Sequence, residues 1–422
     1  MAAIEHPRAS AFFGWRVVAA VFVLAMFGWG VGFYGPPVYL HAVREARGWS
    51  LPLVSAAVTL HFLVGAAVIA NLPRLYGRLG VPRVTKLGSA ALALGVLGWA
   101  VAREPWQLFL ATFLSGGGWV TMGAAAVNAI IAPWFVRTRP LALSSAYNGA
   151  SVGGVVFSPL WVAAIGFVGF PLAATSIGIA MVVVMWILTD LYFAKTPLAM
   201  GLAPDGDAPS AAPATVTSPE ARALPGRALW RDRCFLTLSL AMALGLFAQI
   251  GLVAHLFSLL VPALGEQQAG FAAGGATAAA IGGRMLVGWL MPAGADRRLF
   301  GCASYCVQIL GSLAFFAAGG DDVPLLLLGV VLFGAGIGNA TSLPPLIAQV
   351  EFVKADVARV IPLIVAIAQA SYAFAPATFG LIRDWAPAAD AAPGAAPSLF
   401  AAAALIQACA VAALLLGRRG SD

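Results

Sequence analysis

One arginine lies deep inside an apolar stretch of this chain, with no acidic residue beside it. Arg284 falls within the run from Gln268 to Met291, which is long enough to cross a bilayer. The acidic residues of the chain lie near the ends of such runs or outside them. A planar guanidinium that no protein carboxylate neutralises suits the carboxylate of a ligand. The alternative is that Arg284 lies lower, belongs to a Gly-Arg-x-x-x-Gly loop motif and reaches lipid headgroups.

Two histidines also occupy apolar stretches and could exchange protons. His255 follows Gln249 and Gly251, and His61 lies in the middle of another run. Histidine is the side chain that titrates near neutral pH. Because no Asp or Glu lies in the middle of a run, these histidines or the substrate itself would carry any coupled proton. The alternative for each is a neutral histidine that is hydrogen-bonded to a neighbouring helix.

Further polar side chains within apolar runs are candidates to contact the same ligand. Asn339 can donate a hydrogen bond to a carboxylate, and an aromatic hydroxyl such as that of Tyr147 can line a cavity. The glycines that surround both residues are expected to serve close helix packing. The remaining candidates for substrate binding are Tyr34, Asn128 and Tyr372.

The composition requires that helices in a membrane position these residues. Of the 422 residues, 61% are hydrophobic and only 10% are charged, and the mean hydropathy is +0.91. A soluble domain carries about 25% charged residues, so this chain cannot cover a water-facing surface of its size. The net charge of +7 therefore does not indicate nucleic-acid binding, since basic residues orient membrane proteins. The four cysteines have no CxxC spacing and indicate neither a disulfide framework nor a zinc site.

Twelve runs of about 20 mostly apolar residues predict twelve transmembrane helices. The first is too long for the core of a signal peptide. With a cytoplasmic N-terminus, nearly all Lys and Arg fall on the inside, and only Arg44, Arg47, Arg103 and Arg383 fall outside. Both termini are therefore predicted to be cytoplasmic. The predicted spans begin near Trp15, Leu51, Val84, Trp106, Leu141, Phe170, Phe235, Gln268, Leu299, Val323, Val357 and Pro397.

A polar segment divides the chain into two halves of six predicted spans each. Residues 195–233 are rich in Pro, Ala, Ser and Asp and lack helical periodicity, which predicts a flexible cytoplasmic linker. The expected domains are residues 1–194, the linker 195–233 and residues 234–422. Equal halves around a linker suggest an internal repeat with a binding site at the interface of the halves.

A loop motif of glycine and basic residues occurs twice in the chain. Residues 73–83 are its first copy, and residues 283–298, which end in Asp296, Arg297 and Arg298, are its second copy. Both copies resemble the glycine, aspartate and basic loop motif of the major facilitator superfamily, although Gly77 replaces the aspartate in the first copy. Three further segments resemble the monocarboxylate-transporter and oxalate/formate-antiporter branch. They are the start of the first predicted helix (residues 13–18), the passage from the fourth to the fifth (134–154) and the end of the sixth (195–206). The arginine that many proton-coupled relatives carry in helix 4 has no counterpart here.

The resemblance implies an all-α membrane protein with the major facilitator fold and assigns roles to two residues. In monocarboxylate carriers the arginine of helix 8 binds the substrate carboxylate, which would be Arg284 here. The branch also has a histidine of helix 7 near its substrate, which would be His255. Oxalate-type carriers use a second cation in helix 11, whereas residues 360–380 contain no Lys or Arg.

These features favour a secondary active transporter of small organic monocarboxylate anions rather than an enzyme. Its expected location is the cell membrane, in particular a bacterial inner membrane. The expected partners are an organic anion, a proton and the bilayer, with no nucleic acid, no metal and no cofactor, and the expected functional unit is a monomer. Proton-coupled uptake by alternating access is the expected mode. An alternative is proton-driven transport of larger amphipathic or neutral metabolites. No nucleophile with a base, metal-ligand cluster or phosphate-binding loop indicates an enzyme.

Overall fold

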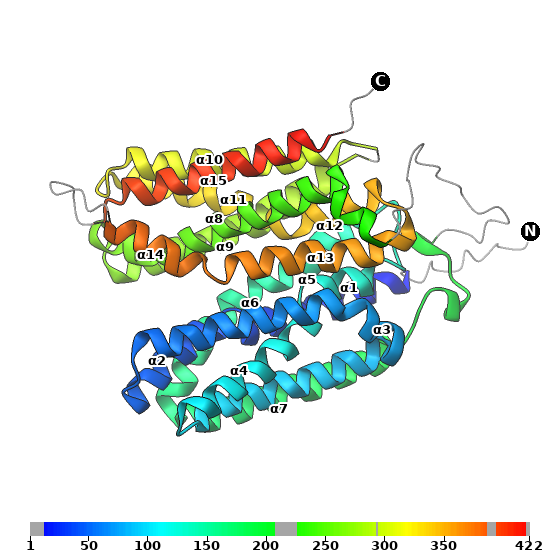
Figure 1. The fold of residues 1–422 in the computed structure, drawn as a ribbon, viewed down its shortest axis with the longest axis horizontal. Coiled ribbons are helices and arrows are strands. Elements are labelled where there is room, and N and C mark those ends of the chain that lie inside the picture. The colour runs from blue at the N-terminus through cyan, green and yellow to red at the C-terminus, as the bar shows by residue number, and fades with distance from the viewer. Residues whose placement is uncertain (1–11, 207–225, 293, 386–393, 419–422) are drawn as a thin grey trace, which may run out of the picture.

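The computed structural model describes residues 12–206, 226–292, 294–385 and 394–418, whose regular elements are helices. Helices α1–α7 form a first group, in the lower part of Figure 1, and helices α8–α15 form a second group, in its upper part. The first group comprises α1 (Phe13–Gly32), α2 (Gly35–Arg47), α3 (Leu51–Val101), α4 (Pro105–Trp119), η1 (Val120–Met122), α5 (Ala124–Ile131), α6 (Arg139–Val168), α7 (Phe170–Leu188) and η2 (Thr189–Phe193). The second comprises α8 (Arg233–Leu264), α9 (Glu266–Leu290), α10 (Arg297–Ala317), α11 (Val323–Ile337), α12 (Asn339–Glu351), α13 (Lys354–Tyr372), α14 (Ala375–Trp385) and α15 (Pro397–Leu416).

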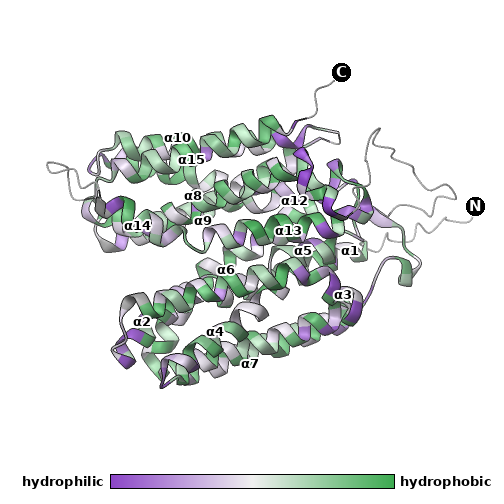
Figure 2. Cartoon of the chain, viewed as in Figure 1, coloured by the Kyte–Doolittle hydropathy of each residue, from purple (hydrophilic) through white to green (hydrophobic). Residues whose placement is uncertain are grey.

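The apolar lengths of these helices are those of a membrane protein. Among the described residues, ten helical stretches are long and apolar enough to cross a bilayer. Figure 2 shows hydrophobic residues along the helices and hydrophilic residues gathered towards the two ends of the bundle. Large apolar side chains such as Phe167 and Trp289 are exposed on the outside, as expected for a surface that faces lipid rather than water.

The twelve predicted spans differ from the ten stretches at two places. Those that begin near Leu51 and Val84 lie in one helix, α3, which contains a break at Gly80 (φ 77°, ψ 155°). A positive φ of this kind suits glycine because it has no Cβ. Helix α9, which contains Arg284 and several glycines, is not among the ten. The count of twelve spans therefore stays a prediction.

Several other predicted spans are interrupted in mid-length. The first divides into α1 and α2, the fourth into α4, η1 and α5, the tenth into α11 and α12, and the eleventh into α13 and α14. Each interruption releases backbone carbonyls from the helical ladder. At two of them, the carbonyls of Gly32 and Gly338 accept side-chain hydrogen bonds from His61 and Arg284. Irregular backbone inside the bundle thus supplies acceptors for buried polar groups.

Glycines bring neighbouring helices into backbone contact. A Cβ added at Gly149 of α6 would lie 2.0 Å from the carbonyl oxygen of Phe22 in α1. One added at Gly283 of α9 would lie 2.1 Å from the carbonyl oxygen of Ala335 in α11. These approaches are too close for any side chain larger than hydrogen, so the glycines fix the α1–α6 and α9–α11 packing.

The beginning of the predicted linker is anchored to the first group of helices. Asp205, in the short helix η4 (Pro204–Gly206), accepts hydrogen bonds from the backbone N–H of Val136, Arg137 and Thr138 and from the Thr138 hydroxyl. Asp205 thus ties this part of the predicted linker to the first group, because one carboxylate accepts from the donors that precede α6. The proline-rich part, residues 207–225, lies outside the described residues.

The Asp205 anchor makes stability depend on pH. Burial acts to raise the pKa of Asp205, but the hydrogen bonds from the Thr138 hydroxyl and from three backbone N–H groups outweigh it, so its pKa lies below the usual value. A lowered pKa in the folded state stabilises the protein above the unfolded-state pKa, which is about 3.9, and this contribution is lost as the pH falls through the folded-state pKa.

We expect Asp205→Asn to lower the melting temperature at pH 7 and to lessen its further fall between about pH 5 and pH 3. Asparagine tolerates the positive φ of 59° at this position, so the change tests the charge rather than the backbone. Thermal unfolding of purified protein across this pH range measures both effects. Asp321→Asn, in an exposed turn, is the control, and an equal change there would contradict the anchor.

Candidate functional site

Arg284 is buried where the two groups of helices meet. Its side chain is only 4% exposed, and its Nε donates to the carbonyl oxygen of Gly338 at 2.8 Å. Gly338 lies at the break between α11 and α12, and a Cβ there would lie 3.0 Å from the Arg284 Nε atom. The α11–α12 break and the absence of a side chain at Gly338 together position the guanidinium.

The other end of the guanidinium crosses to α6 in the first group. Its Nη1 donates to the amide oxygen of Asn148 at 2.9 Å and to the hydroxyl of Ser151 at 3.4 Å. All three partners of Arg284 are neutral, and among the described residues no carboxylate forms an ion pair with it. Its second amino group, Nη2, forms no hydrogen bond within the same part of the chain. The site is a buried cation with unused donors.

Two tyrosines lie near this cation. Tyr34 and Tyr147 lie close enough to interact electrostatically with Arg284. The ring of Tyr34 packs over Gly154, where an added Cβ would lie 2.7 Å from the ring. Tyr147 is fully buried and donates its hydroxyl hydrogen to the carbonyl oxygen of Ala124. The structure thus brings both predicted tyrosines near Arg284.

A chain of polar side chains extends from Tyr147 across to the second group. The Asn128 amide donates to the Tyr147 hydroxyl at 2.6 Å. The Gln349 amide of α12 donates to the Asn128 oxygen at 3.4 Å, and Arg139 donates to the Gln349 oxygen at 3.1 Å. Asn128 therefore takes part in a contact between the groups, and its donors are already directed to Tyr147 and Ala124.

Tyr372 belongs to a second contact between the groups, where α13 meets α3. Its hydroxyl donates to the Gln369 oxygen at 3.1 Å, and the Gln369 amide donates to the carbonyl oxygen of Phe62 at 2.9 Å. The Tyr372 ring packs edge-to-face against Phe33 and Phe62. Tyr372 thus contacts Gln369, Phe33 and Phe62, and it is not among the hydrogen-bond partners of Arg284.

His61 is enclosed within the first group. It is 1% exposed, its Nε2 lies 2.9 Å from the carbonyl oxygen of Gly32, and its Nδ1 lies 2.9 Å from the Ser115 hydroxyl. A carbonyl can only accept, so Nε2 carries a hydrogen, and Nδ1 of a neutral ring can accept from Ser115. Its ring also stacks on Trp119. This geometry is that of the neutral, helix-bonded alternative.

His255 lies elsewhere, between α8 and α14. Its Nε2 is 3.0 Å from the carbonyl oxygen of Pro376, and the side chain is half-buried. Both its helix and its partner belong to the second group. Within the described residues, His255 does not contact Arg284, so any influence of its protonation on the cation would act through the intervening structure.

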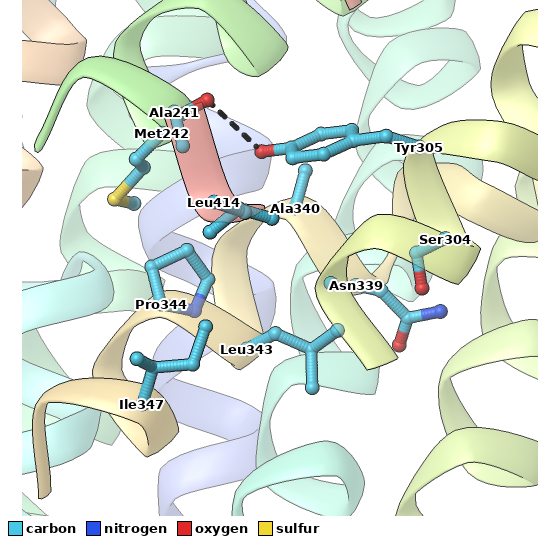
Figure 3. Close-up of a pocket in the computed structure, with 11 residues that line it drawn as sticks. Ala241, Met242, Ser304, Tyr305, Asn339, Ala340, Leu343, Pro344, Ile347 and Leu414 are labelled. Atoms are coloured by element: carbon cyan, nitrogen blue, oxygen red, sulfur yellow. Dashed lines mark hydrogen bonds between the residues drawn. The ribbon is translucent and has the colours of Figure 1, made fainter. Parts of the chain in front are cut away.

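Asn339 faces a small pocket inside the second group rather than the contact between the groups. Figure 3 shows its side chain beside Ser304 of α10, in a pocket that is also lined by Tyr305, Leu343 and Met242. Its amide oxygen is buried without a hydrogen-bond partner in the described protein. Asn339 directly follows Gly338, the Arg284 partner, but its side chain is not among the hydrogen-bond partners of the guanidinium.

The two loop motifs contain different charge contacts. In the second copy, Arg298 is 2% exposed on its side chain and forms a bidentate pair with Glu351. Near the first copy, which has Gly77 in place of the aspartate, Lys86 of α3 pairs with Asp190 of η2 at 2.6 Å. Among the described residues, no group of three His, Cys, Asp or Glu side chains could hold a metal ion.

The sequence did not indicate the partners of Arg284, nor the residues Gln349 and Arg139 that join the two groups of helices. Asn148 and Ser151 are three residues apart in α6, a spacing that places both on one face of a helix. This polar face in a helix rich in small residues is the signal that could have indicated them. Gln349 and Arg139 lie near helix ends, where polar residues are ordinary, so the sequence carries no comparable signal for them.

Comparison with known proteins agrees with this architecture. The chain aligns structurally with the FucP transporter in its outward conformation at a TM-score of 0.68 and 15% identity, covering 96% of this chain and 99% of that one. A second structure of the Escherichia coli fucose:proton symporter FucP gives 0.67, 15% identity, and coverage of 96% and 98%. The human organic anion transporter MFSD10 (TETRAN) gives 0.65 at 15% identity, with coverage of 98% and 100%.

Sequence comparisons identify the family. MFS-type transporter 1 of Ophiocordyceps sp. (strain BCC 1869) is 29% identical over 185 residues, which span 43% of this chain and 40% of that relative's length. The family model described as "Major Facilitator Superfamily" matches residues 17–376. Because this match covers most of the chain, the protein belongs to the Major Facilitator Superfamily, a family of membrane transporters.

Proposed function

We propose that this protein is a secondary active transporter of small organic monocarboxylate anions. The observation that carries the proposal is the Arg284 guanidinium, which is buried between the two groups of helices. Within the part of the chain that the structure describes, its partners are neutral and its Nη2 makes no hydrogen bond. A buried cation is costly unless an anion or several acceptors compensate it. A substrate carboxylate would supply two charged acceptor oxygens to this fork.

The number of cations in this region supports a single carboxylate. Helix α13, the counterpart of the helix in which oxalate-type carriers have a second cation, has its basic residues Lys354 and Arg359 in its first two turns. The side chains of Gln369 and Tyr372, further along α13, are neutral and bonded to each other. One buried cation matches one negative charge, which favours a monoanion over a dianion.

We propose alternating access by two halves, residues 1–194 and 234–422, which the linker 195–233 connects. Twelve spans with both termini in the cytoplasm account for the basic residues and for the break at Gly80. A functional monomer in the cell membrane, by inference a bacterial inner membrane, would suffice. A coupled proton would travel on His255, on His61 or on the substrate acid. Of the two histidines, His255 has the more accessible ring.

A specific observation favours a second candidate, the transport of larger amphipathic or neutral compounds. Phe33, Phe62, Trp119 and Tyr372 form an aromatic cluster where α1, α3, α4 and α13 meet. Aromatic surfaces bind apolar parts of ligands. The structural neighbours include a fucose:proton symporter and an organic anion transporter, so their substrates do not separate the two candidates.

A ligand screen at two pH values separates these candidates. We expect monocarboxylic acids to raise the melting temperature of the purified protein and to drive counterflow of a labelled acid in proteoliposomes. For coupled uptake, transport should increase when the outside is acidified. Matched neutral amides of the same acids are the control, because they keep the shape and lose the charge. Equal stabilisation by acids and amides would favour the second candidate.

A further inference from the structure

Arg284 joins the two groups of helices, because one of its hydrogen bonds stays within its own group and two cross to the other group. Its Nε bond goes to Gly338, in its own group, whereas both of its Nη1 bonds go to α6 in the other group. When α6 and α9 separate, the guanidinium keeps Gly338 and loses Asn148 and Ser151. The contact between α6 and α9 therefore depends on which groups accept hydrogen bonds from Nη1.

The cost of separation depends on whether a carboxylate is bound. In the empty protein, parting α6 from α9 would leave Nη1 without its two acceptors in a poorly solvated position, which is unfavourable for a charged group. A carboxylate that spans Nη1 and Nη2 replaces those acceptors with charged oxygens, which form stronger hydrogen bonds. The bound anion then stays with α9 when α6 moves away.

We propose that Asn148 and Ser151 are positioning residues that hold the empty protein closed at the α6–α9 contact until the substrate carboxylate replaces them on Arg284. This proposal rests on the proposed function, in which Arg284 binds the carboxylate. Its consequence is that the loaded protein changes conformation faster than the empty one. Exchange of internal for external acid is then faster than net transport.

The neighbouring contact at Ser144 offers a reporter of this opening. Ser144 lies on α6 one turn before Asn148, is 3% exposed and packs so closely on α9 that a Cβ at Gly288 would lie 2.4 Å from its hydroxyl oxygen. A cysteine placed there would react with a maleimide only when α6 and α9 separate. The exposed Cys306 and Cys409 would be replaced by serine to remove background labelling.

The labelling experiment tests, without any substrate, whether Asn148 and Ser151 keep α6 and α9 together. In the Ser144→Cys reporter, we expect Asn148→Ala together with Ser151→Ala to increase the labelling rate of the empty protein about fivefold or more, the usual range of a coupling between sites. Asn71→Ala, the same chemical change at an exposed position of α3, is the control and should leave the rate unchanged. An unchanged rate in the double variant would overturn the proposal.

Exchange measurements test the role of the substrate. In proteoliposomes without the reporter cysteine, we expect Asn148→Ala to reduce the ratio of acid exchange to net efflux, while Ser144→Ala keeps the original ratio. We expect Asn148→Asp to abolish stabilisation by acids, because its carboxylate would occupy Arg284. An unaltered exchange ratio in Asn148→Ala, with acid binding intact, would overturn the proposal and leave the proposed function standing. A different result would be faster labelling in the double variant together with no binding of acids by the protein. It would refute the proposed function but support the role of Asn148 and Ser151 in keeping α6 and α9 together.

Discussion

Replacing Arg284 with alanine is expected to abolish stabilisation by carboxylic acids and to reduce their transport by about 100-fold or more, which corresponds to about 3 kcal/mol for a lost buried charge contact. The substitution removes the cation that would bind the carboxylate and leaves the acceptor groups of Gly338, Asn148 and Ser151 without their donor. Transport of a labelled acid into proteoliposomes and ligand-induced thermal stabilisation measure the two effects.

Arg284→Lys is expected to fail almost as completely. Lysine keeps the charge but lacks the planar fork, so it cannot hold Gly338 while it binds both oxygens of a carboxylate. Arg78→Ala, which removes an exposed arginine from the first loop motif, controls for the loss of one positive charge. Full acid uptake by Arg284→Lys, or an equal loss in Arg78→Ala, would contradict the assignment of Arg284.

Replacing Glu351 with alanine is expected to destabilise the second group of helices by about 3 kcal/mol, at the lower end of the range for a broken buried pair. Arg298 ties four helices together, since it pairs with Glu351 of α12 and also donates to Thr237 and Cys234 of α8 and to the Leu414 carbonyl of α15. Without Glu351, a cation that is almost fully buried loses its counter-ion. A lower melting temperature in thermal unfolding measures this effect.

The Lys86–Asp190 pair provides a matched comparison. It also joins two helical elements, but its aspartate side chain is 65% exposed, so Asp190→Ala is expected to cost less than about 1 kcal/mol. Replacing both Arg298 and Glu351 with apolar residues of similar volume should recover most of the stability lost in Glu351→Ala, because no unpaired charge remains. Equal losses in Glu351→Ala and Asp190→Ala would show that burial does not determine the strength of these pairs.

The sequence indicated the class of protein with little ambiguity. A charged fraction of 10% and twelve apolar runs leave few soluble alternatives, and the predicted superfamily is confirmed by the family match over residues 17–376. The predicted monocarboxylate branch, the twelve spans and the orientation stay predictions. The composition is informative because the bilayer imposes one solvent along the whole length of each helix.

The sequence also indicated that Arg284 lacks an acidic neighbour along its own run, and the structure pairs it only with neutral groups among the described residues. Local sequence can indicate this absence because the acidic residues lie near the ends of the runs. It could not indicate Asn148 and Ser151 as partners, since they are more than 130 residues away. Their contact depends on how α6 and α9 are rotated and how the two groups of helices meet.

Tertiary structure decided the surroundings of the other polar candidates. His61 and His255 both occupy apolar runs, yet one is enclosed between Gly32 and Ser115 and the other lies half-buried against Pro376. Asn339 faces a pocket within the second group, although the residue before it contacts Arg284. A helix offers every side chain a different neighbour at each 100° of rotation. The sequence therefore determined which residues enter the membrane, and only the packing of distant helices decided what each one contacts.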